Sequence, residues 1–474
     1  MKLTIDDVLS LEHIRGLNIE DLRRQKGIRV STDSRTTQSG DVFFALRGEK
    51  FDGHQFLQQA FEKGASLAVV DTRADVRSIA DRSLLVVPDT TKALGRLANI
   101  HRKKFSIPFI AIAGSNGKTT TKDMIATVLG KKYRVLKTEG NLNNHIGVPH
   151  TLFRLKPSHD LAVVEIGTNH FGELAYLCDV LQPTDGLITN IGREHLEFFR
   201  DLQGVAKEEG ELFHSLRSAG TGYVNMDDPW IARAASKLRR KRTYGFSLYG
   251  ADVRGAFRGL DGKGRATFSV KMRRKKEFTV HLAVPGKHAA ANALAAAAVG
   301  LSFGVRVRSV QQALEQFIPS DKRMKIISAG GMRIIDDTYN ANPDSMRVAL
   351  ETLQAMNCRG KKIAVLADML ELGGRSEEEH RRIGAMVSNV ADYLLTYGSL
   401  AKVIYQEARV SSKFHYEEKN VLSEYLSEIV SSGDIILVKG SRAMKMEDVV
   451  TFLYERLKKH RSGASGAGRF AESG

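Results

Sequence analysis

The 474-residue chain has only two cysteines, Cys178 and Cys358, which lie far apart in the sequence. Two such cysteines exclude a disulfide framework and a cysteine-based zinc site. The chain also lacks an apolar run long enough to span a bilayer, and its N-terminus lacks the apolar core of a signal peptide. These absences predict a cytoplasmic protein without membrane insertion.

The chain also has few acidic residues relative to basic ones, and its formal net charge is +17. A basic chain favours anionic partners, which are either nucleic acids or phosphorylated small molecules. The basic residues form scattered runs, such as 239–242 and 273–276, and no aromatic platform, zinc finger or recognition-helix pattern accompanies them. We therefore expect these runs to lie in solvated loops and hairpin edges, and we expect no nucleic-acid partner.

Length and pattern together predict a three-domain α/β protein. Residues 1–107 alternate short apolar strands with helical patterns, residues 108–320 form a second unit, and residues 321–459 repeat the alternation. The segment 460–474 is rich in Gly, Ser and Ala, which predicts a disordered tail. Apolar runs predict strands at 42–46, 67–70, 84–87, 109–113, 161–166, 186–189, 332–335, 362–366, 393–396 and 435–438, and an alanine-rich helix at 289–300.

The most informative motif is Ala-Gly-Ser-Asn-Gly-Lys-Thr-Thr at 113–120. It follows an apolar strand and precedes a helical apolar stripe at 120–129, and that order builds a phosphate cradle. Glycines let backbone N–H groups approach the anion, the helix N-terminus adds positive potential, and Lys118 and Thr119 reach phosphate and Mg²⁺. Ile112 replaces the first glycine of the full Walker pattern, so an ordinary turn is the alternative. The flanking strand and helix favour nucleotide-phosphate binding.

Two further polar residues stand where parallel sheets place ligands. Glu165 lies in an otherwise apolar strand, and a buried carboxylate is costly unless a cation or metal pairs with it. A lysine or arginine partner is one reading, and a Mg²⁺ ligand is the one we favour beside a phosphate loop. His195 follows the next strand at its carboxyl end. Taken singly, these signals predict a Mg²⁺-dependent P-loop enzyme.

Read together, the motifs resemble the Mur ligase family, which uses ATP to join amino acids or peptides to carboxylates. The loop at 114–120, Glu165, and Asn-Ile-Gly at 190–192 with His195 resemble its central domain. Asp-Ser-Arg at 33–35, Gly-Asp-Val-Phe-Phe-Ala-Leu-Arg-Gly at 40–48 and Phe-Asp-Gly-His at 51–54 resemble the uridine-nucleotide domain shared by the third and fourth ligases of the family. The fourth ligase, which adds D-alanyl-D-alanine to UDP-N-acetylmuramoyl-tripeptide, is resembled more narrowly by Asp-Asp-Thr-Tyr-Asn-Ala-Asn-Pro at 336–343 with Ser-Met at 345–346, Asp-Met-Leu-Glu-Leu-Gly at 368–373 and Lys-Gly-Ser-Arg-Ala at 439–443. The resemblance reaches to about residue 455.

This resemblance implies a UDP-substrate α/β domain, a central P-loop ATPase-like domain with a parallel sheet, and a Rossmann-like C-terminal domain. It implies an ATP- and Mg²⁺-dependent ligase of peptidoglycan precursor synthesis that forms an acyl phosphate. The expected partners are therefore small molecules, UDP-N-acetylmuramoyl-tripeptide and D-alanyl-D-alanine, and the expected state is a monomer.

The resemblance also assigns residues. The nucleotide side comprises Gly114, Ser115, Asn116, Gly117, Lys118, Thr119, Thr120, Asn292, Arg323 and Asp337, the last two arriving as the third domain closes. Lys118, Glu165, His195 and Glu209 are the expected catalytic residues; Thr119 and Glu165 are expected at one Mg²⁺, and His195 and Glu209 at a second. The UDP-sugar side comprises Ser34, Arg35, Asn143, Asn144, Thr168 and Asn169, and the dipeptide side comprises Asn340, Asn342 and Ser441.

Three positions depart from the family pattern. Glu209 stands where the family commonly has a carbamylated lysine, Ala289 replaces an asparagine of the adenine side, and Ala367 replaces a glycine. These departures leave open a degenerate relative that only binds nucleotide. A second hypothesis is a related ligase with a different acceptor, such as the third Mur ligase, whose Asp-Asn-Pro-Arg is absent from this chain. A third is a basic nucleic-acid-binding ATPase.

Overall fold

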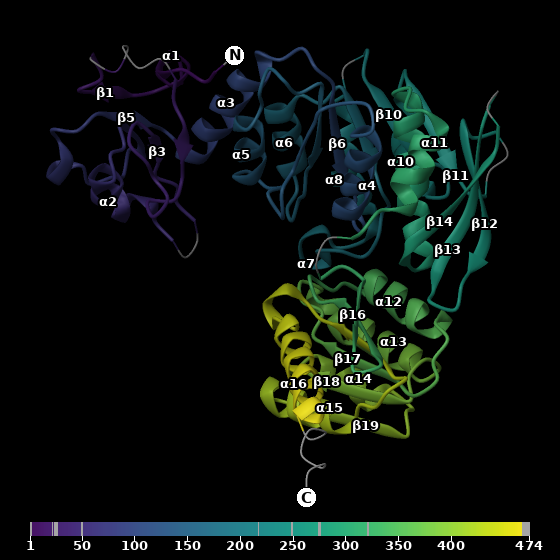
Figure 1. The fold of residues 1–474 in the computed structure, drawn as a ribbon. Coiled ribbons are helices and arrows are strands. Elements are labelled where there is room, and N and C mark those ends of the chain that lie inside the picture. The colour runs from purple at the N-terminus through teal and green to yellow at the C-terminus, as the bar shows by residue number, and fades with distance from the viewer. Residues whose placement is uncertain are drawn as a thin grey trace, which may run out of the picture.

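The structure is a computed structural model that describes residues 2–466, except 21, 23–26, 49–50, 217, 248–249, 274–275 and 320–321. Three sheets of five, nine and six strands follow one another along this part of the chain (Figure 1). The three-domain α/β fold class is therefore confirmed. The residues at which one domain ends and the next begins stay a prediction.

The N-terminal sheet has the strand order β1-β5-β4-β3-β2, in which only the β1–β5 pair is antiparallel. The predicted strands at 42–46, 67–70 and 84–87 are confirmed as its three central strands. The elements are α1 (Ile5–Leu9), β1 (Arg15–Leu17), β2 (Val30–Ser31), β3 (Val42–Phe44), α2 (Leu57–Glu62), β4 (Leu67–Asp71), β5 (Leu84–Val87) and α3 (Thr90–Lys103).

Helix α3 joins the N-terminal domain to the central one. Asp89 caps its start by accepting hydrogen bonds from the N–H groups of Thr91 and Lys92. Further along, Asn99 donates to the carbonyls of Asp179 and Val180, and Arg102 donates to the carbonyl of Leu181 at 2.7 Å. Those carbonyls lie near the end of α6 (Glu173–Leu181), so α3 is anchored to the central domain through its C-terminal half.

The central sheet has the order β14-β13-β12-β11-β10-β9-β6-β8-β7. The seven strands β12-β11-β10-β9-β6-β8-β7 pair in parallel, which confirms the parallel strands predicted at 109–113, 161–166 and 186–189. Strands β12, β13 and β14 form an antiparallel meander, which the sequence analysis does not predict. The strands are β6 (Phe109–Ala113), β7 (Val135–Lys137), β8 (Leu161–Glu165), β9 (Asp185–Ile188), β10 (Thr221–Asn225), β11 (Lys241–Gly245), β12 (Val253–Leu260), β13 (Arg265–Met272) and β14 (Phe278–Pro285).

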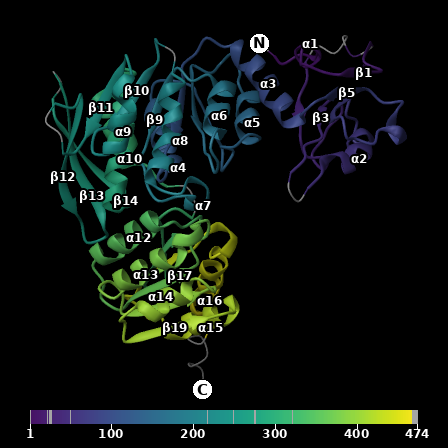
Figure 2. The ribbon, with the colours of Figure 1, turned by 180° about the vertical axis from the view of Figure 1, so that it is seen from behind.

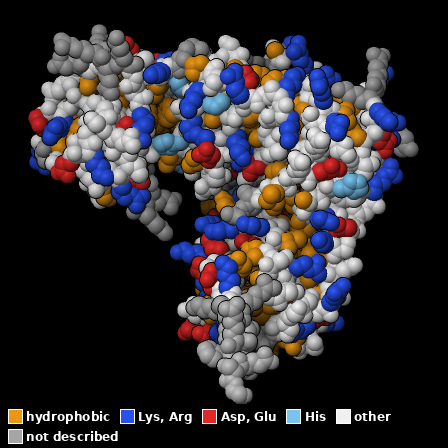
Figure 3. Space-filling view, in the orientation of Figure 1, with side chains coloured by type: hydrophobic (Ala, Val, Ile, Leu, Met, Phe, Trp, Pro, Cys, Tyr) orange, Lys and Arg blue, Asp and Glu red, His pale blue; other side chains and the backbone are white. Residues whose placement is uncertain are grey.

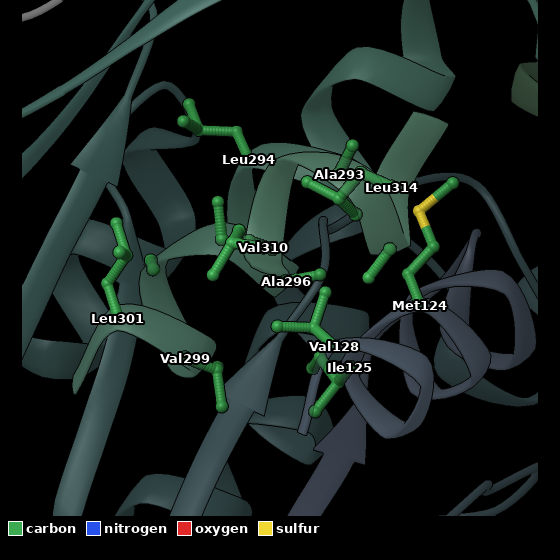
Figure 4. Close-up of a cluster of buried hydrophobic side chains, with 14 of the residues drawn as sticks. Met124, Ile125, Val128, Ala293, Leu294, Ala296, Val299, Leu301, Val310 and Leu314 are labelled. Carbon is green, nitrogen blue, oxygen red and sulfur yellow. The ribbon is translucent and has the colours of Figure 1, made fainter. Parts of the chain in front are cut away.

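The helices of the central domain pack closely because many of their facing side chains are small. Helix α10 (Lys287–Ser302) contains the predicted alanine-rich segment and lies against α4 (Lys118–Leu129) and α11 (Val307–Glu315) (Figure 4). A Cβ at Gly300 would lie 2.3 Å from Cγ1 of Val128, so glycine permits this approach. The shorter helices are α5 (Gly147–Phe153), α7 (Leu196–Phe199), α8 (Leu202–His214) and α9 (Pro229–Ala234).

The C-terminal sheet has the order β15-β16-β20-β17-β18-β19, and only β15 is antiparallel to its neighbour. All four strands predicted for this domain are confirmed. The elements are β15 (Lys325–Ala329), β16 (Met332–Asp337), α12 (Pro343–Ala355), β17 (Lys362–Ala367), α13 (Ser376–Val387), β18 (Tyr393–Tyr397), α14 (Ala401–Glu407), β19 (Ser412–Tyr416), α15 (Lys419–Ile429), β20 (Ile435–Lys439) and α16 (Glu447–Gly466).

Helix α16 starts at Glu447 and continues through Gly466, so it overlaps the first residues of the segment 460–474. The disordered tail stays a prediction. Residues 467–474 of the predicted tail lie outside the described residues. None of the helices in the described part of the chain has both the length and the apolar character needed to cross a bilayer.

The C-terminal domain packs against the central domain, whereas the N-terminal domain projects to one side (Figures 1 and 2). Leu196, Phe199 and Val205 from the central chain segment belong to the hydrophobic core of the C-terminal domain. Lys and Arg side chains are spread over the visible face of the central domain (Figure 3). The basic run 239–242 is exposed at the start of β11, as expected, and residues 274–275 of the second run lie outside the described residues.

Candidate active site

The phosphate loop joins β6 to α4 and depends on two glycines with positive φ. Gly114 has φ +113° and Gly117 has φ +79°, values that glycine adopts at little cost. A Cβ at Gly114 would lie 2.4 Å from Oγ1 of Thr189, and one at Gly117 would lie 2.8 Å from Oδ1 of Asn292. The two glycines therefore permit the close approach of the loop to Thr189 and Asn292. The loop leads directly into the N-terminus of α4, the end of a helix that favours an anion.

Lys118, the first residue of α4, lies among three carboxylates. Its Nζ donates to the carbonyl of Gly114 and lies 3.4 Å from Oε2 of Glu194. Burial alone would lower the pKa of Lys118, but the nearby carboxylates of Glu194, Glu209 and Glu165 outweigh it and raise the pKa above its usual value. Lys118 is therefore a fixed positive charge beside the phosphate cradle.

Glu165 ends strand β8 and faces the start of α4. Its Oε1 accepts hydrogen bonds from the Thr119 hydroxyl at 3.1 Å and from Nδ2 of Asn143 at 2.9 Å. Its Oε2 is buried without a hydrogen-bond partner and lies 3.9 Å from Nζ of Lys122, which donates instead to the carbonyl of Thr138 at 2.9 Å. Lys122 thus gives Glu165 a distant lysine neighbour but leaves one carboxylate oxygen free for another cation.

Glu209 lies in α8 directly behind the phosphate loop. Its Oε2 accepts the N–H of Gly114 at 2.7 Å, and its Oε1 is buried without a hydrogen-bond partner. Burial raises the pKa of the Glu209 carboxyl to about 8; Lys118 opposes this rise and Glu194 adds to it. The carboxyl therefore supports the backbone of the loop that was predicted to receive the nucleotide.

His195 begins the loop-to-helix transition after β9 and has φ +45°. Its Nδ1 lies 2.6 Å from Oε2 of Glu371, a residue of the C-terminal domain. The hydrogen bond to His195 lowers the pKa of the Glu371 carboxyl below its usual range. His195 therefore stands where the central and C-terminal domains meet.

A cleft of about 1410 Å³ contains most of the predicted site residues. The predicted residues that line it are Ser115, Asn116, Gly117, Lys118, Thr119, Thr120, Asn143, Asn144, Glu165, Thr168, Asn169, His195, Asn292, Arg323, Asp337, Asn340, Asn342 and Ser441. Gly114 and Glu209 lie behind its wall and are not among the lining residues, and neither are Ser34 and Arg35. Most of the residues predicted for the nucleotide, the metal and the dipeptide thus line one cleft between two domains.

The C-terminal side of the cleft is held by a second set of contacts. Arg323 stacks on the Tyr339 ring, with its guanidinium carbon 3.8 Å from the ring centroid. Nζ of Lys439 lies 2.5 Å from Oδ2 of Asp337, and the N–H of Met324 donates to Oδ1 of Asp337 at 3.1 Å. Arg323 and Asp337 line the same cleft as the phosphate loop, and these contacts hold their side chains in place.

The predicted dipeptide residues differ in how available their side chains are. Ser441 is buried, and its Oγ accepts the N–H of Leu370 at 2.8 Å. Asn340 accepts the N–H of Arg442 at 3.1 Å through Oδ1. Asn342 caps α12 and donates through Nδ2 to Oδ1 of Asn116 at 3.0 Å. These side chains shape the loop around 340–342.

The predicted UDP-sugar residues fall into two groups. On the central domain, Thr168 donates to the carbonyl of His170 at 2.8 Å, at the edge of the cleft. On the N-terminal domain, Ser34 is buried and donates to Oε1 of Gln59 at 2.6 Å, whereas the Arg35 side chain is 80% exposed and pairs with Asp33. The structure therefore does not bring Ser34 and Arg35 to the phosphate loop.

Several residues of the site were not predicted. Glu194 contacts Lys118, Glu371 contacts His195, and Lys439 contacts Asp337. Glu194 sits in the same loop as His195 at the carboxyl end of a parallel strand, and that position was the available signal. Lys439 also ends a buried parallel strand, β20, and carried the same signal.

The chemistry of the donor groups fits magnesium better than a protein-only metal cage. Among the residues described, no group of three or more His, Cys, Asp or Glu side chains could hold a metal ion. Mg²⁺ usually binds one or two carboxylates and completes its shell with water and substrate phosphate. Glu165 with Thr119 meets that requirement, and the buried Oε1 of Glu209 and Oε2 of Glu165 both lack a hydrogen-bond partner.

Comparison with known families agrees with this geometry, and the chain belongs to the Mur ligase family. Residues 29–102 match the family model "Mur ligase family, catalytic domain", residues 112–300 match "Mur ligase middle domain", and residues 322–442 match "Mur ligase, glutamate ligase domain". Together these matches cover most of the chain and follow the order of the three sheets.

Two curated relatives carry the same name within that family, UDP-N-acetylmuramoyl-tripeptide–D-alanyl-D-alanine ligase. The relative from Bacillus subtilis is 37% identical over 90% of this chain and 93% of its own length. The relative from Escherichia coli is 36% identical, with the same coverage of both chains.

Solved structures agree with the curated relatives. MurF from Acinetobacter baumannii superposes with a TM-score of 0.87 at 31% identity, covering 96% of this chain and 99% of its own. MurF ligase from Thermotoga maritima in complex with ADP has a TM-score of 0.81 at 27% identity, covering 91% and 98%.

Proposed function

We propose that this protein is an ATP-dependent ligase that joins D-alanyl-D-alanine to UDP-N-acetylmuramoyl-tripeptide in peptidoglycan precursor synthesis. The single observation that carries the proposal is the cleft, in which a phosphate loop faces residues of the C-terminal domain in a chain whose curated relatives have this name. The proposal includes a monomer that works on small molecules and binds no nucleic acid.

The first step activates a carboxylate. A carboxylate does not react with an amine at neutral pH, so an oxygen of the tripeptide carboxylate attacks the γ-phosphorus of ATP, the bond to the β-phosphate oxygen breaks, and ADP leaves. Charge neutralisation and alignment dominate such phosphoryl transfers. Lys118 supplies a fixed positive charge, the loop N–H groups and the N-terminus of α4 orient the phosphates, and Arg323 and Asp337 enclose the nucleotide from the other side.

The second step forms the amide. The amine of D-alanyl-D-alanine attacks the acyl carbon of the acyl phosphate, the carbon–oxygen bond to phosphate breaks, and inorganic phosphate leaves as the amine loses a proton. Asn340, Asn342 and Ser441 are the proposed dipeptide residues. Asn143, Asn144, Thr168 and Asn169 are proposed for the UDP-sugar substrate, joined by Ser34 and Arg35 once the N-terminal domain approaches.

Magnesium, when bound, would neutralise phosphate charge during transfer. Thr119 and Glu165 would hold one ion, and the free Oε2 of Glu165 supports that assignment. His195 and Glu209 are proposed for a second ion, with Oε1 of Glu209 as the available oxygen. Glu209 would replace a carbamylated lysine without covalent modification, and a bound ion would displace the proton that burial favours on this carboxyl.

Phosphate release tests the function directly. Purified protein with ATP, Mg²⁺ and UDP-N-acetylmuramoyl-tripeptide should release phosphate rapidly only when D-alanyl-D-alanine is added. Replacing the dipeptide by L-lysine or meso-diaminopimelate, the acceptors of a third-type ligase, should give no stimulation. Stimulation by those amino acids or by DNA, and none by the dipeptide, would reject the proposal.

A further inference from the structure

The loop 190–195 that follows β9 contacts the phosphate loop along one side. The N–H of Ser115 donates to the carbonyl of Asn190 at 2.9 Å, and the N–H of Gly192 donates to Oγ of Ser115 at 2.8 Å. The N–H of Asn116 donates to Oδ1 of Asn190 at 3.1 Å. Nδ2 of Asn190 also donates to the carbonyl of Asn116 at 2.7 Å, and Oγ of Ser115 lies 3.2 Å from the carbonyl of Gly192. These hydrogen bonds fix the positions of the two loops relative to each other.

The same loop contacts the C-terminal domain through Arg193. The backbone N–H of Arg193 donates to Oδ2 of Asp344 at 2.7 Å, and its guanidinium lies 3.4 Å from Oδ1 of Asp344. The guanidinium also lies 3.4 Å from Oε1 of Glu379, whose side chain is only 3% exposed. A Cβ at Gly192 would lie 2.9 Å from Oδ2 of Asp344, so glycine permits the approach.

One acidic partner of Arg193, Asp344, lies beside the predicted dipeptide side, and the other, Glu379, lies on α13. Asp344 is in the first turn of α12, two residues after Asn342, which donates to Oδ1 of Asn116 in the phosphate loop. Glu379 lies in α13, and burial raises the pKa of its carboxyl while Arg193 opposes that rise. Opening the interface removes one of the two arginines that contact Glu379 and leaves only Arg382, which lies 3.0 Å from the same carboxylate oxygen. Losing part of the positive charge around a buried carboxylate disfavours its charged form.

We propose that Arg193 is a positioning residue that holds the C-terminal domain against the phosphate loop before nucleotide arrives. This inference rests on the proposed ligase function, because it concerns how the same cleft is assembled. Arg323 and Asp337 reach the nucleotide side only while the two domains are in contact. A ligand that needs both domains binds with an apparent affinity reduced by the fraction of molecules in which they are apart.

The test compares Arg193→Ala with Arg382→Ala. Arg382 also contacts Glu379, at 3.0 Å, but both residues lie on α13, so this control removes an arginine from the same carboxylate without touching the interface. In Arg193→Ala, small-angle scattering should show a larger radius of gyration without ligand and recovery with a non-hydrolysable ATP analogue. The KM for ATP should rise about tenfold, which is a typical size for the coupling between a domain contact and ligand binding. The kcat should change less than about twofold. Arg382→Ala should match the wild type in all three.

Two further variants keep the test decisive. Arg193→Lys keeps the charge but not the planar fork that reaches two carboxylates, so it should recover part of the compaction and part of the ATP affinity. If Arg193→Ala has a lowered melting temperature, Glu379→Gln replaces it, with the same expansion expected. An unchanged radius of gyration together with unchanged ADP affinity by calorimetry would overturn the proposal. These readouts need no turnover, so a failure of the ligase assignment in the wild type would be seen separately.

Discussion

At the scale of single residues, the charge on Lys118 is the most consequential feature of the cleft. Lys118→Ala should leave the fold intact and lower ligase turnover about 100-fold or more, because the γ-phosphate loses its fixed positive partner. Lys137→Ala is the matched control, since Lys137 is half-exposed and pairs with Asp123 rather than with the cleft carboxylates. Near-normal turnover in the Lys118 variant would remove the phosphate loop from the mechanism.

Glu209 makes a second residue-scale prediction. If it replaces a carbamylated lysine, activity should be the same in bicarbonate-free and bicarbonate-containing buffer, and Glu209→Gln should need sharply more Mg²⁺. Glu209→Lys should recover activity only with added bicarbonate. A Mg²⁺ titration of Glu209→Gln that overlays the wild type would restrict Glu209 to its hydrogen bond with Gly114.

The residues that bind phosphate could be predicted from the sequence because phosphate binding depends on a short contiguous motif. Lys118, Thr119 and Glu165 lie together as expected. Glu371 and Asp344 could not be predicted, since they reach the cleft from elsewhere in the chain and their importance appears only when two domains are in contact. Glu209 was predicted as a metal residue, but its contact with the loop backbone follows from three-dimensional packing.

At the scale of elements, strands were predicted better than their connections. Buried parallel strands are continuous apolar runs, so β6, β8, β9 and β20 were evident. The antiparallel strands β12–β14 were not, because half-exposed strands with basic residues and a β-bulge give a weak alternation. Helix α3 has two packed faces, one in each domain, which the pattern of a single helix does not reveal.

Helix α3 also gives an element-scale prediction with a pH dependence. Burial lowers the pKa of His101 to about 4, and nearby Lys104 adds to the shift; its ring packs against Phe105 and Phe153. The pKa of His101 in the folded protein lies below its value of about 6.5 in the unfolded chain, so protonation favours the unfolded chain. The stability that the neutral His101 ring contributes is therefore fully present above pH 6.5 and is lost as the pH falls toward 4. The loss at pH 5 should be about 2 kcal/mol.

Urea unfolding at pH 7.5 and pH 5 measures this effect. His101→Phe keeps an aromatic ring in the site and removes the titration, so the variant should lose less stability on acidification than the wild type. Equal losses in the two proteins would show that His101 does not contribute to the acid sensitivity of α3.

At the scale of the whole molecule, the position of the N-terminal domain is the feature that must change. Arg323 and Asp337 already line the cleft, but Ser34 and Arg35 do not, and the N-terminal domain projects away from it (Figure 1). The radius of gyration should therefore decrease when UDP-N-acetylmuramoyl-tripeptide is added, and an ATP analogue alone should change it little. Compaction with the analogue alone, or none with the UDP substrate, would contradict this arrangement.

Oxygen labelling of the substrate carboxylate tests whether the ligase forms an acyl phosphate. UDP-N-acetylmuramoyl-tripeptide with ¹⁸O in both oxygens of its terminal carboxylate is incubated with ATP, Mg²⁺ and D-alanyl-D-alanine, and the products are weighed by mass spectrometry. An acyl phosphate predicts one ¹⁸O in the released phosphate and one in the new amide of UDP-N-acetylmuramoyl-pentapeptide. Unlabelled phosphate, or phosphate released without any pentapeptide product, would contradict the account.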